Sequence, residues 1–190
     1  TATDNAWNNT YQNSDAFTID STNPSIDSIS TLENNISNWK INALQISFSE
    51  NIDDSSIIYS DFSINWWAIT PIWISTWGST DDDEILLLFN ETWDTGDTPT
   101  LRYTWTSVSD LSGRKLQTTT TLNSSDGATP RLKNIEIFDN NSNWKLDKIE
   151  VTYSEDLNNS TTVSWWNIDN ILSWMSISSL SISWDTINLI

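Results

Sequence analysis

Residues 139–155 read DNNSNWKLDKIEVTYSE, and residues 34–50 carry a degenerate copy, NNISNWKINALQISFSE. Each copy joins a loop rich in Asn and Asp to a run of alternating apolar residues, which is the pattern of a half-buried strand. The apolar positions of the two runs are Ile149, Val151 and Tyr153 in the later copy and Leu44, Ile46 and Phe48 in the earlier one. The stretch therefore predicts a β-protein built from a repeated unit.

The spacing of the copies sets the size of that unit. Trp144 follows Trp39 by 105 residues, and Pro130 follows Pro24 by 106. The turn DLSGR at residues 110–114 likewise follows DNAWN at residues 4–8 by 106. A β-sandwich domain has about 100 residues, so the spacing predicts tandem sandwiches.

Turn and linker signals divide the chain into three parts. Residues 1–22 are predicted to be the tail of a preceding repeat or a linker, with a strand at residues 16–19 and a linker from Asp20 to Pro24. An N-terminal strand pairing with the next domain is the alternative. Residues 23–127 are predicted to form a complete sandwich, and residues 128–190 a second one that lacks its last strands.

Seven short strands are predicted for the complete sandwich. The fifth, EILLLFN, is apolar on both faces and is therefore expected at the centre of a sheet. Leu44, Ile46, Phe48, Leu87 and Phe89 are expected between the sheets. The predicted ranges are an opening strand with Ile26 and Ile29, then residues 40–49, 62–64, 68–75, 84–90, 100–106 and 115–121.

A family resemblance rests on short motifs that span nearly the whole chain. They are Asn143-Trp144-Lys145 with Asp147, the strand ends Phe48-Ser49-Glu50 and Tyr153-Ser154-Glu155, and the linker 126–130. This pattern resembles the immunoglobulin-like or cadherin-like repeats of large bacterial surface proteins, such as adhesins and S-layer proteins. The resemblance implies an all-β fold of tandem immunoglobulin-like β-sandwiches. It further implies a non-catalytic extracellular spacer or adhesion module at the cell surface, with neighbouring repeats and a surface glycan or protein as partners.

Tryptophan occupies positions that suit glycine. The chain has 13 Trp and 4 Gly, whereas glycine usually makes up roughly 7% of residues. Most of the Trp residues lie among turn formers, as in Asn-Trp-Lys at Trp39 and Trp144. We infer that many of them stand for glycine, as happens when a bacterial lineage reads UGA as glycine. The alternative is a Trp-rich β-protein, for which Trp105 is the best-placed residue.

Composition excludes several functions. With 26 acidic and 8 basic residues the net charge is −18, which argues against nucleic acid and favours either cation binding or solubility. The chain has no His and no Cys, which excludes Ser-His-Asp and Cys-His catalysis. No apolar run is long enough for a membrane span. A carboxylate pair for glycoside hydrolysis stays open among the 26 acids, but no motif marks one, so the chain is predicted not to be an enzyme.

One loop has the spacing of a calcium site. Calcium takes six to eight oxygen ligands, and alternate residues of a 12-residue loop of the EF-hand kind supply them. The residues at those places are Asp139, Asn141, Asn143, Asp147 and Glu150. The sixth place, which requires glycine, is Trp144. A plain Asn/Asp turn is the alternative, and the earlier copy, with Ile36 and Gln45 at ligand places, is predicted to bind nothing.

Other features carry weaker hypotheses. The acidic run 81–84 indicates a solvated turn, or a calcium-binding loop between stacked domains. Asp94-Thr95-Gly96 matches the aspartic-protease triplet but lies in a polar turn, which favours a turn. If the Trp residues are real, a carbohydrate-binding module of a secreted protein is the rival function, because exposed Trp rings stack on sugars.

Overall fold

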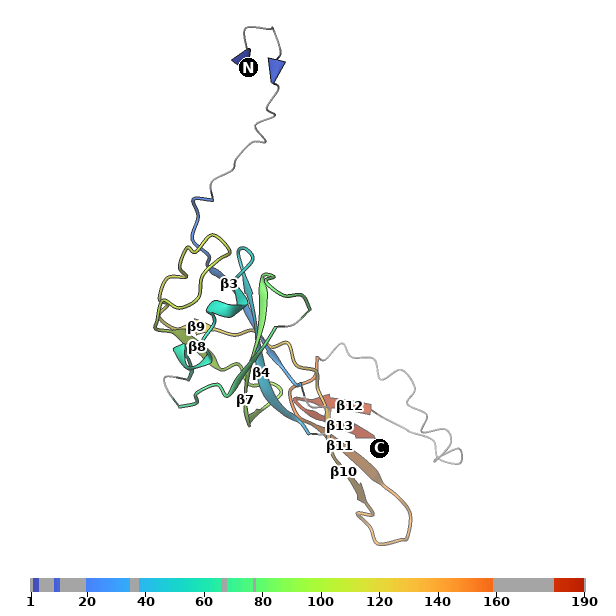
Figure 1. Ribbon diagram of the computed structural model, residues 1–190. Helices are drawn as coiled ribbons and strands as arrows, with labels where there is room; N and C mark the ends of the chain where they lie inside the picture. The colour runs from blue at the N-terminus through green and yellow to red at the C-terminus, as the bar shows by residue number, and fades with distance from the viewer. Residues whose placement is uncertain are drawn as a thin grey trace.

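The protein is described here from a computed structural model, which covers residues 2–3, 9–10, 20–34, 38–65, 68–76, 78–158 and 180–189. Strands dominate it, with only two short 3₁₀ turns (Figure 1), so the all-β prediction is confirmed. The elements are β1 (Ala2–Thr3), β2 (Asn9–Thr10), β3 (Ile26–Leu32), β4 (Lys40–Phe48), η1 (Asp54–Ser56), η2 (Tyr59–Asp61), β5 (Phe62–Ile64), β6 (Trp73–Ser75), β7 (Glu84–Asp94), β8 (Thr100–Tyr103), β9 (Leu122–Asn123), β10 (Leu132–Phe138), β11 (Lys148–Tyr153), β12 (Leu180–Ser183) and β13 (Thr186–Leu189).

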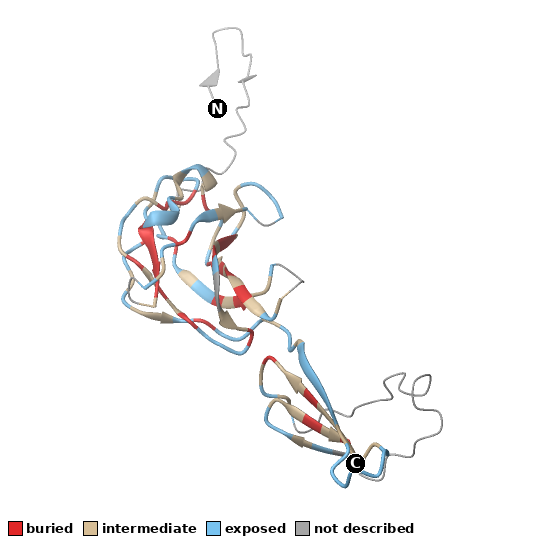
Figure 2. Ribbon diagram, turned by 90° about the horizontal axis from the view of Figure 1, so that it is seen from below, coloured by how far each residue is buried: buried red, intermediate tan, exposed pale blue. Residues whose placement is uncertain are grey.

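Two sheets pack into a sandwich between Ile26 and Asn123. One has the strand order β3-β4-β7-β6 and the other β5-β8-β9, and all their pairings are antiparallel. Side chains from both sheets form one buried cluster, which includes Ile46 and Leu87 from the first and Phe62 and Tyr103 from the second. Most of the buried residues, red in Figure 2, lie in this sandwich.

The central strands carry the residues that the sequence placed in the core. β7 pairs with β4 on one side and β6 on the other, which confirms it as a central strand. The five predicted core residues, Leu44, Ile46, Phe48, Leu87 and Phe89, are all buried. Their burial removes apolar surface from water and is the main driving force for the fold.

A second four-stranded sheet repeats the order of the first. Its strands run β10-β11-β13-β12. Val151 is buried in it, and Ile149 and Tyr153 pack half-buried around the same small cluster. Ile135, which follows the buried Ile29 by 106 residues, is 50% exposed. Within the described residues, the face that β5, β8 and β9 cover in the sandwich is thus open here.

Three predicted strands are absent or shorter than predicted, and β7, which was predicted to end at Asn90, continues to Asp94. Residues 115–121 form no strand, because only Thr119 of this segment bonds β8: its N–H donates to the Tyr103 carbonyl oxygen at 2.9 Å and its hydroxyl accepts the Tyr103 N–H at 3.0 Å. The strand predicted at 100–106 ends at Tyr103, which leaves Trp105 exposed. The strand predicted at 68–75 begins only at Trp73, after Pro71, which lacks an N–H donor.

The N-terminal part is only sparsely described. β1 and β2 pair as a two-stranded ladder, whereas the strand predicted at residues 16–19 and the turn at residues 4–8 lie outside the described residues. Among the residues described, no helix is long and apolar enough to cross a membrane.

Candidate cation sites

The predicted calcium loop connects β10 to β11 and is held by its own side chains. Asp139 accepts the backbone N–H groups of Asn143 at 3.1 Å and Trp144 at 2.9 Å through its two oxygens. Asp147 closes the other end by accepting the Asn140 N–H at 2.8 Å and the Asn141 side-chain amide at 3.2 Å. Four of the five predicted ligands, Asp139, Asn141, Asn143 and Asp147, therefore share one exposed loop.

The position of Glu150 argues against its role as a ligand in that loop, whereas the backbone of Trp144 fits the loop. Glu150 lies inside β11 and pairs with Lys148 at 2.5 Å, so it is held by the strand rather than the loop. Trp144 has φ of 66° and is 97% exposed. A positive φ favours glycine, since a Cβ atom crowds the following carbonyl there. The sixth place of the loop thus has the backbone conformation that the spacing demands.

The earlier copy of the loop has one of the same hydrogen bonds and a second whose donor is shifted by one residue. The Asn38 side chain accepts the Lys40 N–H at 3.3 Å, as Asn143 accepts that of Lys145 at 2.8 Å. The Asn42 side chain accepts the Asn34 N–H at 2.7 Å, which resembles the bond from the Asn140 N–H to Asp147 but has its donor one position earlier in the repeat. Trp39, at 38% exposure, has no positive φ. The two loops have similar side-chain-to-backbone hydrogen bonds but differ in charge, because Asn42 is neutral where Asp147 is acidic.

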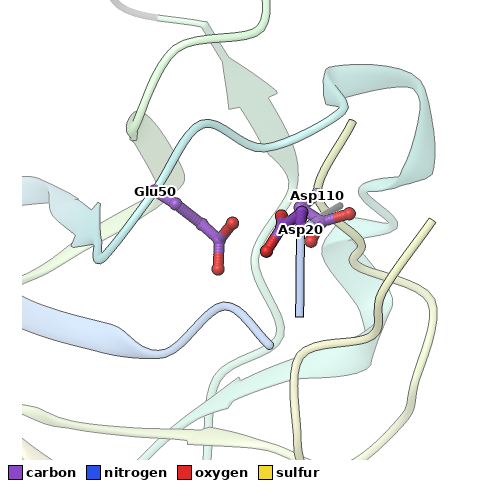
Figure 3. A group of neighbouring side chains, drawn as sticks. All are labelled: Asp20, Glu50 and Asp110. Carbon is purple, nitrogen blue, oxygen red and sulfur yellow. The ribbon is translucent and has the colours of Figure 1, made fainter. Parts of the chain in front are cut away.

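A group of three carboxylates lies where the linker meets the sandwich. Asp20 belongs to the linker, Glu50 follows β4, and Asp110 begins the turn after β8. One oxygen of each lies within 4.8 Å of the others, the only such trio of carboxylates in the described ranges. Figure 3 shows the Glu50 side chain extended toward Asp20 and Asp110. The sequence predicts Asp20 in a linker, Glu50 at a strand end and Asp110 in a turn. No pattern in the sequence indicates that the three side chains lie close together.

Asp110 is the fixed member of the trio. Only 2% of the residue is exposed, and its Oδ1 accepts the N–H groups of Ser112 at 2.7 Å and Arg114 at 2.9 Å. Gly113, with φ of 82°, allows the tight turn that brings these donors together. Asp110 Oδ2 is buried without any hydrogen-bond donor. A buried carboxylate oxygen without a partner is costly, because it loses water and gains nothing in return.

The pKa values of the other two carboxylates shift in opposite directions. Loss of solvent raises the pKa of Glu50, and the charges of Asp20 and Asp110 raise it further. The backbone N–H of Thr22 lowers the pKa of Asp20, as does the hydroxyl of the same residue. The Arg114 guanidinium donates to the Asp20 carbonyl oxygen at 2.8 and 2.6 Å. The trio therefore creates a negative potential that this arginine only partly offsets.

More acids surround the trio at the same end of the sandwich. We name this end the linker pole and define it as the loops after β4, β6 and β8. The acidic run 81–84 lies at the linker pole as a hydrogen-bonded turn. Asp81 and Asp54 exchange backbone-to-carboxylate hydrogen bonds of 3.0 Å, and Asp82 accepts the N–H groups of Ser79 and Glu84, each at 3.0 Å. Burial raises the pKa of Asp54. The linker pole is thus strongly acidic.

The second sheet touches the opposite end of the sandwich, and we name these contacts the joint. Thr95 and Ser154 share a buried hydrogen bond of 2.5 Å between their hydroxyls. Arg131 pairs at 2.6 Å with Glu33, whose side chain is 2% exposed. Asp94 pairs with Lys133 across the joint at 3.2 Å and with Lys40 of its own sheet at 2.5 Å. Asp94 therefore ends β7 in two ion pairs, and the turn predicted for residues 94–96 follows it at Thr95 and Gly96.

Glu155 and two glycines complete the joint. The pKa of Glu155 is raised to about 7, first by burial and then by the neighbouring Asp126 carboxylate. A Cβ on Gly96 would lie 2.7 Å from the Glu155 Cβ, and one on Gly127 would lie 2.7 Å from the Thr31 carbonyl oxygen. Both glycines therefore allow close approach of the chain segments at the joint.

Comparison with known proteins gives one similar structure. No protein-family model matches the chain, and no curated protein matches it in sequence. Among solved structures, the N-terminal part of the bacterial S-layer protein SbsC is similar, at 18% sequence identity and a TM-score of 0.43. The similarity covers 61% of this chain and 26% of that one.

Proposed function

We propose that the chain is a segment of tandem immunoglobulin-like sandwiches that acts as a spacer or adhesion module on the surface of a bacterial cell. It performs no catalysis. Its immediate partners are the neighbouring repeats of its own chain, and a glycan or protein of a cell surface is the further partner of the whole molecule.

The strand order of the sandwich supports the immunoglobulin-like part of the proposal. Lettered A to G in chain order, β3 to β9 form one sheet A-B-E-D and another C-F-G. This is the arrangement of the constant-type immunoglobulin domain. The four-stranded sheet outside the sandwich has the same A-B-E-D order, with strands β10, β11, β13 and β12.

The observation that carries the tandem arrangement is a set of hydrogen bonds that recurs along the chain. Ser49 Oγ accepts the Ser25 N–H at 3.0 Å, and Ser154 Oγ accepts the Arg131 N–H at 2.9 Å, with offsets of 105 and 106 residues. Two backbone bonds recur as well: Phe48 to Asp83 with Tyr153 to Asp185, and Ile52 to Asp82 with Leu157 to Trp184; their donors lie 105 residues apart and their acceptors 102. Equivalent bonds at nearly the same offset are expected of repeated units and serve no catalytic purpose.

The location is tested by labelling cells. Antibodies raised against residues 23–127 should bind intact, unpermeabilised cells of the source bacterium, and mild protease treatment of those cells should remove the signal. A cytoplasmic protein serves as the control that stays unlabelled until the cells are permeabilised. Labelling only after permeabilisation would contradict the surface proposal.

A second function, carbohydrate binding, is favoured by the exposed indoles. Large parts of Trp73, Trp105, Trp144 and Trp184 face solvent, and such rings stack on sugars. Affinity electrophoresis in gels that contain soluble polysaccharides separates the two functions. Retardation that is lost in the Trp73→Ala or Trp105→Ala variant would favour a binding module, whereas unretarded migration in every gel would favour the spacer.

A further inference from the structure

We propose that Asp20, Glu50 and Asp110 bind a calcium ion at the linker pole of the sandwich. The site lies far along the chain from the loop at residues 139–150 and shares no residue with it. It deepens the proposed spacer function, since an ion there would tie the linker to the domain that follows, but ion binding itself does not depend on that function.

The spacing of the three side chains fits calcium. Their oxygens lie within 4.8 Å of one another, and calcium binds oxygens at about 2.3–2.6 Å, so two ligands on opposite sides of one ion are separated by about this distance. All three are carboxylates, the hard ligands that calcium prefers. The Thr22 hydroxyl, 3.0 Å from Asp20 Oδ1 and 3.5 Å from Glu50 Oε1, adds a neutral oxygen nearby.

The buried oxygen of Asp110 is the observation that points to a ligand. Asp110 Oδ1 is committed to the N–H groups of its own turn, which fixes the direction of the side chain. Oδ2 is left buried and without a donor in a residue that is 2% exposed. Coordination of a cation would supply the partner that this oxygen lacks and would offset the cost of its burial.

The charges around the trio match a divalent ion. The three carboxylates are opposed by one guanidinium, that of Arg114, which is directed to the Asp20 carbonyl rather than to a carboxylate. The Lys115 ammonium donates to the Ser107 carbonyl oxygen at 2.8 Å. The remaining charged groups on the loops after β4 and β6 are acids: Asp53, Asp54, Asp61, Asp81, Asp82 and Asp83. An ion of charge +2 would balance the trio and Arg114.

The same pair of acids recurs at the start of the second sheet. Asp126 follows Asp20 by 106 residues and Glu155 follows Glu50 by 105. The two carboxylates interact, as those of Asp20 and Glu50 do. A linker acid placed against a strand-end acid is therefore a repeated feature of the chain, and the trio adds the buried Asp110 to it.

Isothermal titration of the EDTA-treated full chain with calcium chloride tests the site. We expect binding that weakens by about 10- to 100-fold or more in Asp110→Asn, which keeps the Oδ1 acceptor but removes the charge, and in Glu50→Gln. Asp147→Asn, in the β10–β11 loop, is the matched control and should leave this binding unchanged. Circular dichroism of each variant checks that the fold is retained.

Other outcomes overturn the inference. If millimolar calcium gives no binding, or if binding survives Asp110→Asn and Glu50→Gln but is lost in Asp147→Asn, the trio is not a calcium site. Magnesium chloride at the same concentration should bind at least tenfold more weakly, because Mg²⁺ demands octahedral geometry at about 2.0–2.1 Å. Equal magnesium affinity would contradict a calcium site. None of these results depends on surface labelling, so failure here and failure of the proposed function are distinguishable.

Discussion

At the scale of single residues, Trp144 shows how the sequence and the backbone disagree. Its φ of 66° costs a non-glycine residue about 1–2 kcal/mol, and its side chain, which is almost wholly in solvent, gains nothing from packing. We therefore predict that Trp144→Gly raises the free energy of unfolding by about 1 kcal/mol, as measured by urea denaturation of the full chain.

Trp39→Gly is the matched control for that change. Trp39 occupies the corresponding loop but has no positive φ, so glycine there should lower stability by about 0.5–1 kcal/mol through chain entropy. Equal effects of the two substitutions would remove the conformational argument for glycine. Mass spectrometry of tryptic peptides from the native organism would then report directly whether residue 144 is Gly or Trp.

The sequence did not predict the cluster of Asp20, Glu50 and Asp110. The loop Asp139–Asp147 was visible because its acids lie close together in sequence. Asp20, Glu50 and Asp110 are brought together only by the fold, since the linker, the end of β4 and the turn after β8 meet at one pole. The available signal was that all three sit at marked positions of the repeat, but spacing along the chain says nothing about distance in space.

At the scale of elements, β7 is the strand that joins β4 on one side to β6 on the other. Leu87 is fully buried at its centre and pairs with Leu44 of β4 and Ile74 of β6. Leu87→Ala should destabilise the chain by about 2–5 kcal/mol, through lost transfer energy and the cavity left behind. Thermal or urea unfolding measures this cost.

Ile137→Ala serves as the exposed counterpart. Ile137 is 69% exposed on β10, so its truncation should change the unfolding free energy by less than about 0.5 kcal/mol. A comparable loss at both positions would mean that the face of the second sheet is covered in solution.

The apolar pattern predicted β4 and the three-residue β5 closely, but it wrongly predicted a strand at residues 115–121. β4 lies nearly at its predicted bounds, whereas β7 begins at the predicted Glu84 but continues to Asp94, past the predicted end at Asn90. Residues 115–121 have a pattern too, but Leu116 fills the core alone and Thr119 is the one residue of the segment that bonds β8, through its N–H and its hydroxyl. One buried residue followed by one bonded residue looks like alternation in sequence, although no ladder forms.

The β10–β11 loop gives a prediction of its own. In the Trp144→Gly chain, we expect calcium to raise the melting temperature, because an ion that binds only the folded state stabilises it. Adding Asp147→Asn to that chain should abolish the shift, since Asp147 closes the loop. An unchanged melting temperature in millimolar calcium would leave the loop as an Asn/Asp turn.

At the scale of the whole molecule, the joint depends on close approach at Gly96. A Cβ there would lie 2.7 Å from that of Glu155, so Gly96→Ala should force the second sheet away from the sandwich. The expected loss is about 1–3 kcal/mol of unfolding free energy. Thr98→Ala, in the same loop and exposed, should be neutral, and equal stability of the two variants would argue against a tight joint.

Glu155 makes the joint sensitive to pH. Its pKa is raised from the ordinary 4.5 to about 7 in the folded chain, so the folded state favours the protonated form. The stabilisation is complete below about pH 4.5 and is lost as the pH rises through 7. The melting temperature should therefore fall between pH 5 and 8, and Glu155→Gln should flatten that slope. A wild-type melting temperature that is constant over this range would contradict the account.

A spacer requires that the sandwich and the second sheet keep a fixed arrangement, and spin labels measure this directly. The chain has no Cys, so cysteines introduced at the exposed Leu111 and Ile137 can be labelled without background. Pulsed electron paramagnetic resonance should give one narrow distance distribution across the joint, as narrow as that of a control pair at Leu111 and Trp73 within the sandwich. A broad or multi-peaked distribution across the joint, beside a narrow control, would contradict the account.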